Sequence, residues 1–228
     1  MADDRPVAVL TALAEELAGI RRALASSPGI VLAATGDGPR RAASGAARLL
    51  ERHRPAAVIG AGLAGALSPD LVVGDLVASR RVRFQVGDAA TPDARWLERA
   101  KAAGAKPATL VTVDRPVVSA AARSSLAGPA TGREEPVAVD MESAAWAREA
   151  AARGIPYLVL RAISDEAGDE LPAFLAECVG PDGSIRRGQV ARRALFRPAS
   201  WGTLARMRRR LHEQSEALGA FLARMLAS

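Results

Sequence analysis

The chain has 228 residues, of which 49% are hydrophobic and 25% are charged, with a net charge of +6. This length fits one large domain or two small ones and is enough to bury a core. No run of about 20 apolar residues suits a membrane span, and the acidic start does not resemble a secretory signal. The single cysteine, Cys178, excludes an internal disulfide framework. We therefore expect a cytoplasmic protein.

Apolar runs that read as strands alternate with helical patterns along the chain. Buried strands are predicted at 7–13, 29–35, 55–67, 108–117, 137–141 and 155–165, with an extended pair or hairpin at 73–84. Helices are predicted at 14–25, 36–53 after a glycine-rich turn, 92–104 and 142–154, the last two stopped by Gly104 and Gly154. The alternation predicts an α/β fold of three layers, a mixed central β-sheet flanked by helices. We expect a single domain over residues 1–228.

The positive charge is concentrated in a basic C-terminal helical segment, residues 186–228, which carries ten arginines and two glutamates. Apolar residues recur every seven positions at Leu204, Leu211, Leu218 and Met225. One interpretation is a helix that docks by its apolar stripe and leaves its arginines in water. The other is peripheral contact with anionic lipid at the inner membrane surface. A nucleic-acid partner is not expected, because the few aromatic residues are scattered and form no stacking platform.

Charged residues gather where predicted strands end, in the segments VDMES (139–143) and RAISD (161–165). Ligands of open α/β sheets bind beyond the carboxyl ends of strands, and a parallel arrangement would aim both segments at one cleft. Each segment also has a purely structural interpretation. Glu142 could be a helix-start acid, Arg161 could pair with a neighbouring acid, and Asp165 could cap a short helix. Asp140 is expected on the opposite side of its strand from Glu142, in a structural role.

The stretch VDMESAAWAREAAARGIPYLVLRAISDEA resembles the signature of the nucleoside phosphorylase and adenosine-type nucleosidase superfamily. Three earlier segments stand in the same order as that family's first strands: TALAEELAGI, ATGDGPRRAASGAARLL and AAVIGAGLAGALSPDLVVGDLVAS. Two further stretches, VDRPVVSAAARSSL and VGPDGSIRRGQVARRALFRPASWGTL, resemble the branch associated with hopanoid biosynthesis. That branch is thought to release adenine from adenosylhopane and to leave a ribosylhopane. The resemblance implies a small-molecule nucleoside substrate, possible lipid linkage of that substrate, no cofactor, and a homo-oligomer.

The resemblance also implies roles for individual residues. Asp165 would protonate the leaving purine, which requires a carboxyl whose pKa is raised by burial. Glu142 would accept hydrogen bonds from both ribose hydroxyls and support the developing positive charge. Met141 would pack under the sugar, while Arg161 and Ser164 would orient Asp165 or the ligand.

The purine edge and the attacking group are less sharply defined. Val117 and Asp114 are expected near the base, with adenine and other purines both open. In phosphorylases of the superfamily an arginine and a serine hold the phosphate, and Gly60 and Leu63 stand in those places here. The adenosine nucleosidases instead carry an early glutamate that activates water, and Glu16 matches it.

A glycine turn that opens a helix can bind phosphate, so Gly36, Gly38, Arg40 and Gly62 are tentative ligands of a phosphate co-substrate. We expect phosphorolysis, with hydrolysis a close alternative and a non-catalytic nucleoside-binding or membrane-surface module as a third. No metal site is expected, because His53 and His212 lack acidic or cysteine partners at ligand spacing.

Overall fold

The structure is a computed structural model that describes residues 4–128 and 135–227. The strands are β1 Val7–Thr11, β2 Ile30–Ala34, β3 Ala57–Ala66, β4 Leu76–Phe84, β5 Asp88–Ala90, β6 Lys106–Thr112, β7 Val137–Asp140 and β8 Tyr157–Asp165. The helices are α1 Ala14–Ala23, α2 Pro39–His53, α3 Ala94–Ala102, α4 Ala120–Ala127, α5 Ser143–Ala151, α6 Phe174–Glu177, α7 Arg187–Leu195, the 3₁₀ turn η1 Pro198–Ser200 and α8 Trp201–Ala227.

The strands form one mixed sheet that closes on itself. β2, β1 and β3 are parallel neighbours, and β8 continues the parallel set on the other edge of β3. β8 then pairs with β4, β4 with β6, β6 with β7, and β7 returns to β3. The ring is closed by antiparallel pairing of β7 with the last two residues of β3, where Gly65 faces Val139 on one side and Asp165 on the other. The ends of β7 and β8 therefore meet across Gly65.

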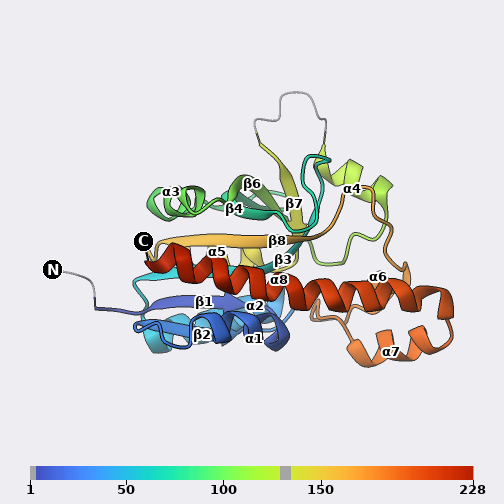
Figure 1. Cartoon of the computed structure of the whole chain (residues 1–228), viewed down its shortest axis with the longest axis horizontal. Helices are drawn as coiled ribbons and strands as arrows, with labels where there is room; N and C mark the ends of the chain where they lie inside the picture. Colours follow the sequence, from blue (N-terminus) through green and yellow to red (C-terminus); the bar gives the residue numbers. More distant parts are fainter. Residues whose placement is uncertain (1–3, 129–134, 228) are drawn as a thin grey trace.

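Helices cover both faces of the sheet, which confirms the expected three-layer α/β fold (Figure 1). Apolar residues of α2 and α5 pack on one face in a core that contains the fully buried Trp146. The other face is covered by α1, α3 and the second half of α8, whose Leu218, Phe221 and Met225 are buried. No helix in the described ranges is long and apolar enough to cross a membrane.

Local sequence explains where the helices start and stop. The Asp93 side chain accepts hydrogen bonds from the backbone amides of Arg95 and Trp96 and so begins α3. Ser119 caps α4 in the same way through the amide of Ala122. Gly104 and Gly154 follow α3 and α5 with φ angles of 104° and 62°, a left-handed conformation that glycine adopts without strain.

Two expectations about the strands need correction. Residues 76–84 form one strand, and the hairpin partner is β5 beyond that segment. The segments VDMES and RAISD do converge, although not through parallel pairing of their strands. β7 runs antiparallel to β3 whereas β8 runs parallel to it, and the curvature that closes the ring brings their ends together.

Candidate active site

A buried arginine on β8 organises the centre of the site. The Arg161 side chain is inaccessible to solvent, and its Nε lies 3.0 Å from Oδ2 of Asp140. Its Nη2 lies 3.5 Å from Oε2 of Glu142, and both Nε and Nη2 donate to the hydroxyl of Ser143. The guanidinium stacks over the ring of Trp146 at 4.9 Å, so neighbouring groups surround it on several sides.

Asp140 is the last residue of β7 and binds the backbone amides at the start of α5. Its Oδ1 accepts hydrogen bonds from the amides of Glu142 and Ser143 at 3.1 Å and from the Thr112 hydroxyl at 2.8 Å. Alternation along a strand separates adjacent residues and not residues two positions apart, and Asp140 and Glu142 both contact Arg161. The expectation that they lie on opposite sides is wrong for that reason.

Glu142 is buried at the N-cap of α5. Its Oε1 accepts a hydrogen bond from the backbone amide of Gly38 at 2.9 Å. Burial raises the pKa of Glu142 to about 8, and the nearby acids Asp140 and Glu16 add to the rise while Arg161 opposes it. A group that donates hydrogen bonds to this carboxyl would stabilise its ionised form.

Glu16, in the first turn of α1, is the second buried glutamate beside Arg161. Its Oε2 accepts from the amides of Ala12 and Leu13 at 3.1 and 2.9 Å, and its Oε1 accepts from the amide of Leu63 at 3.2 Å. Burial raises its pKa, against the opposing charge of Arg161. A Cβ at Gly62 would lie 2.9 Å from the Glu16 Oε1 and 2.3 Å from Nη1 of Arg161. Only glycine leaves room for this pair.

Helix α8 fixes the backbone of Glu16. The Ser215 hydroxyl donates to the Glu16 carbonyl oxygen at 2.6 Å. The two helices approach so closely that a Cβ at Gly19 would lie 2.5 Å from Oγ of Ser215. The half of α8 that carries the apolar stripe therefore supports the site by holding the backbone of Glu16.

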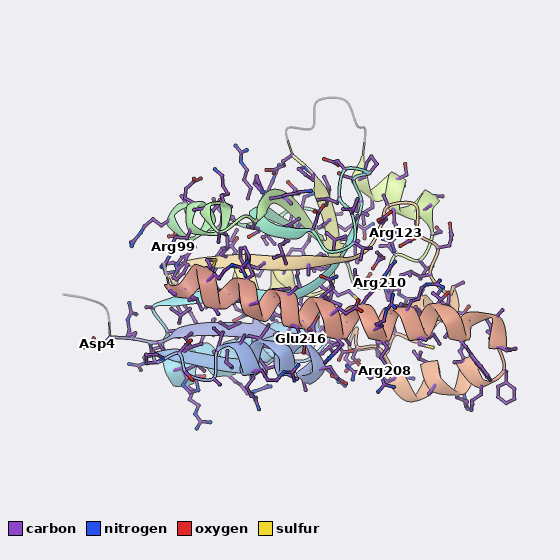
Figure 2. All side chains as sticks on the ribbon, in the orientation of Figure 1. Asp4, Arg99, Arg123, Arg208, Arg210 and Glu216 are labelled. Carbon is purple, nitrogen blue, oxygen red and sulfur yellow. The ribbon has the colours of Figure 1, made fainter. Side chains whose placement is uncertain are left out.

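Asp165 ends β8 and is held by side chains from two directions. The neighbouring Ser164 hydroxyl donates to its Oδ1 at 2.6 Å, and Nη1 of Arg123 lies 2.5 Å from its Oδ2. Arg123 comes from α4 and its side chain is 1% exposed. Arg210 of α8 donates to the Ser164 carbonyl at 2.8 Å, and Figure 2 shows Arg123 and Arg210 at the end of the molecule where β8 ends.

Sequence reasoning missed Arg123. It stands alone among small residues in AAARSSLA, and nothing in that pattern distinguishes a buried arginine from an exposed one. Gly65 makes room for the ion pair, because a Cβ there would lie 2.6 Å from the Asp165 Oδ2 and 2.7 Å from the Arg123 Nη1. The Nε of Arg123 is buried and has no hydrogen-bond partner in the described part of the chain.

Two adjoining cavities meet at Asp165. The inner cavity, about 230 Å³, is lined by residues that include Val117, Arg123, Met141, Glu142, Ser164 and Asp165. The larger cavity, here called the apolar channel, has a volume of about 590 Å³ and shares Leu63, Ser164 and Asp165 with the inner one. It has Glu16 in its wall and runs between α7 and α8, past Leu175, Val190, Leu204 and Met207.

The remaining predicted residues divide into two groups. Met141 and Val117 line the inner cavity, whereas Asp114 is exposed and lines a separate surface hollow. The four tentative phosphate ligands form no common cradle: the Gly38 amide is already bound to Glu142, Gly62 abuts the Glu16 carboxyl, and Arg40 is exposed on α2. Gly36 packs against the Arg41 side chain, which pairs with Asp182 at 2.7 Å.

Comparison with known proteins identifies the family of this chain. The family model described as "Phosphorylase superfamily" matches residues 20–194. The chain belongs to the phosphorylase superfamily. This confirms the resemblance of its sequence to nucleoside phosphorylases and nucleosidases.

Relatives of this phosphorylase-superfamily chain include 5′-methylthioadenosine/S-adenosylhomocysteine nucleosidases. The protein of Chromohalobacter salexigens is 34% identical over 161 residues, which cover 62% of this chain and 68% of the relative. The protein of Geobacillus kaustophilus is 35% identical over 162 residues, covering 61% and 68%. Among solved structures, futalosine hydrolase of Helicobacter pylori superposes with a TM-score of 0.74 at 17% identity, covering 98% of this chain and 97% of the other. At that identity the superposition supports the fold alone.

Proposed function

We propose that this enzyme hydrolyses the N-glycosidic bond of an adenosine-type nucleoside that carries a large apolar group at its 5′ position. One observation carries the proposal: the carboxyl groups of Glu16, Glu142 and Asp165 line two adjoining cavities that meet at Asp165. Membership of the phosphorylase superfamily and the names of its nucleosidase relatives support the same reaction class.

The nucleophile in the proposed step is water. Water attacks C1′ of the ribose as the bond from C1′ to the purine nitrogen breaks, and the electron pair leaves with the base. Glu16 accepts a proton from the water, and Asp165 supplies a proton to the five-membered ring of the purine. Glu142 accepts hydrogen bonds from the two ribose hydroxyls and stabilises the positive charge that develops on the sugar. The purine lies in the inner cavity beside Val117, and Met141 packs under the sugar.

The surroundings of Glu16 favour water over phosphate as the attacking group. The guanidinium of Arg161, the buried cation that could attract phosphate here, is already paired with Asp140 and Glu142. The backbone amides of Leu63 and Gly38 are already bound to the two glutamate carboxyls. Phosphorolysis, the first expectation from sequence, stays a prediction that the experiment below also tests.

The apolar channel supports a large 5′ substituent. Its volume of about 590 Å³ exceeds that of the inner cavity, and its walls between α7 and α8 include Val190, Leu204 and Met207. Burial of an apolar chain contributes roughly 0.8 kcal/mol per CH₂ group, so a long substituent would add substantial affinity. Adenosylhopane, the substrate implied by the resemblance to the hopanoid branch, has such a group. The expected homo-oligomer also remains a prediction.

The reaction is tested by adenine release from adenosine, 5′-methylthioadenosine and a long-chain 5′-alkyl adenosine, each with and without phosphate. We expect release without phosphate, a free ribose product, and kcat/KM that rises about tenfold or more with the long chain. Release that requires phosphate and yields a ribose 1-phosphate would overturn hydrolysis. Equal kcat/KM for the three substrates would overturn the apolar 5′ group.

Neighbouring glutamates on α1 provide a matched pair of variants. Glu16→Gln removes the proposed base and should lower kcat by about 10²–10⁴-fold. Glu15→Gln alters an exposed side chain that pairs with Arg187 at the wall of the apolar channel. With adenosine, which has no 5′ chain to enter the channel, this variant should keep kcat within about twofold, since exposed pairs contribute little. Full activity of Glu16→Gln would show that another group activates the nucleophile.

A further inference from the structure

The connection between α7 and α8 exposes a group of large apolar side chains. Leu195 is 69% exposed, Phe196 83% and Trp201 54%. These three are here called the hairpin tip. Arg197 and the 3₁₀ turn separate Phe196 from Trp201, and the Trp201 indole donates to the carbonyl of Ala194 at 2.6 Å. Across the described ranges, Val72 and Val86 are the other two large apolar residues of comparable exposure, and they stand apart from the tip in sequence. Gathered exposed apolar residues mark interaction surfaces more reliably than isolated ones.

The surroundings of the hairpin tip are strongly positive. Nine arginines and no acidic residue occur from 186 to 212. Five of these arginines are exposed and form no ion pair within the described ranges: Arg186, Arg192, Arg197, Arg206 and Arg208. An apolar tip with a basic surround is complementary to an apolar layer beneath a negative surface.

The hairpin tip also lies where another surface can reach it. Figure 1 shows α7 and the start of α8 beyond the ends of the strands, where the rest of the molecule does not cover them. The apolar channel is lined by Ala194 and Thr203, which adjoin the tip on either side, and it reaches Asp165 at its inner end. A ligand leaving an apolar phase at the tip would meet the mouth of the channel.

We propose that the hairpin tip docks on an anionic lipid membrane, with Leu195, Phe196 and Trp201 in the interfacial layer and the neighbouring arginines against lipid phosphates. Trp residues favour this layer because one edge of the ring is polar and the rest apolar. A second copy of the chain is the poorer occupant, because a two-fold contact at the tip would place the same arginines of both copies against one another. The inference is independent of the reaction proposed above, since docking needs no substrate.

Sedimentation of the full chain with vesicles tests the docking without any turnover. Vesicles of equal parts phosphatidylglycerol and phosphatidylcholine should bind the protein, vesicles of phosphatidylcholine alone should bind it about tenfold less, and high salt should weaken binding. No binding to the anionic vesicles would overturn the proposal.

Two pairs of variants separate docking at the tip from general charge attraction. Leu195→Ser/Phe196→Ser should weaken vesicle binding about tenfold, whereas Val72→Ser/Val86→Ser removes exposed apolar side chains elsewhere and should not. Equal effects of the two double variants would overturn the assignment to the tip.

The second pair compares arginines beside the tip with exposed arginines on α2. Arg192→Gln/Arg197→Gln should weaken binding several-fold, while Arg48→Gln/Arg52→Gln, with the same change of charge, should not. Equal loss in both would show attraction by net charge alone. If instead the wild-type chain self-associated and Leu195→Ser/Phe196→Ser did not, the hairpin tip would be a contact between copies, and the membrane proposal would fail.

Discussion

At the scale of single residues, Asp165 is subject to two opposing requirements. The proposed reaction needs this carboxyl to carry a proton, whereas its contact of 2.5 Å with Arg123 is an ion pair that needs the carboxylate. Ser164 donates to the other oxygen and also favours an acceptor. The ion pair therefore has to loosen, or to share Asp165 with the base, when substrate enters the inner cavity.

The Arg123 ion pair has a measurable energetic signature. Arg123→Met should destabilise the protein by about 3 kcal/mol, because it leaves the Asp165 carboxylate without its buried partner. In an Asp165→Asn background the same change should lower the free energy of unfolding by much less. Urea denaturation of the two single variants and the double variant gives the coupling. Additive effects would contradict a direct energetic link between the two side chains.

Glu142 makes stability depend on pH in a defined direction. Its pKa rises from the ordinary value of 4.5 to about 8, so between these values the folded chain keeps a proton that the unfolded chain has released. The free energy of unfolding must then fall as the pH rises through this window.

Glu142→Gln removes this titration and should flatten the pH dependence of stability. The wild-type chain should lose on the order of a few kcal/mol more than the variant between pH 5 and pH 8, which is several degrees of melting temperature. Thermal melts across that range measure the difference, with Glu51→Gln on the exposed face of α2 as the control. Parallel curves for wild type and Glu142→Gln would refute the assignment.

Much of the residue-level site could be predicted, and the omissions share a cause. Glu16, Met141, Glu142, Ser164 and Asp165 line two adjoining cavities, and the roles that their motifs predict for them stay predictions. Arg123 and the Gly38 amide could not be foreseen, because their contacts with Asp165 and Glu142 depend on how distant segments pack. Their roles in catalysis remain to be tested by the variants above.

At the scale of elements, the close packing of α1 against α8 sets the position of Glu16. Gly19→Ala would force its Cβ to within 2.5–2.8 Å of Ser215 atoms that include backbone, so the helices must separate. We expect a loss of about 1–3 kcal/mol and a lower kcat, because Glu16 moves with α1. Gly188→Ala on α7 meets no atom within 4 Å and should be neutral or slightly stabilising. Unfolding and kinetic measurements on both variants test this prediction. Equal stability and equal kcat for the two variants would argue against tight packing of α1 on α8.

Elements with a strong local signal were the predictable ones. The strands around 7–13, 55–67 and 155–165 were recognisable as apolar runs, and the helices at 92–104 and 142–154 ended at their glycines. Helices α4 and α6 carried no such pattern. Segment 73–84 was ambiguous because its partners, β5, β6 and β8, lie on different parts of the chain.

At the scale of the whole molecule, the closing of the sheet decides where the chemistry lies. Sequence predicted that VDMES and RAISD meet, but local patterns contain no information on the antiparallel return of β7 to β3. That return leaves Gly65 between the two strand ends, with Asp165 and Arg123 beside it. The same molecule presents the apolar channel and the hairpin tip at one end, away from the packed half of α8.

The hydrogen bond between Ser215 and Glu16 has a consequence for how the protein is made. It joins residues 199 positions apart, so the glutamate leaves the ribosome long before the serine that fixes it has been synthesised. Contacts of such large sequence separation form late, after the loop between them has been closed at a cost in entropy. A nascent chain that has not yet made α8 lacks this bond and the helix that packs against α1. The contact of α8 with the Glu16 backbone can therefore form only after residue 215 has been synthesised.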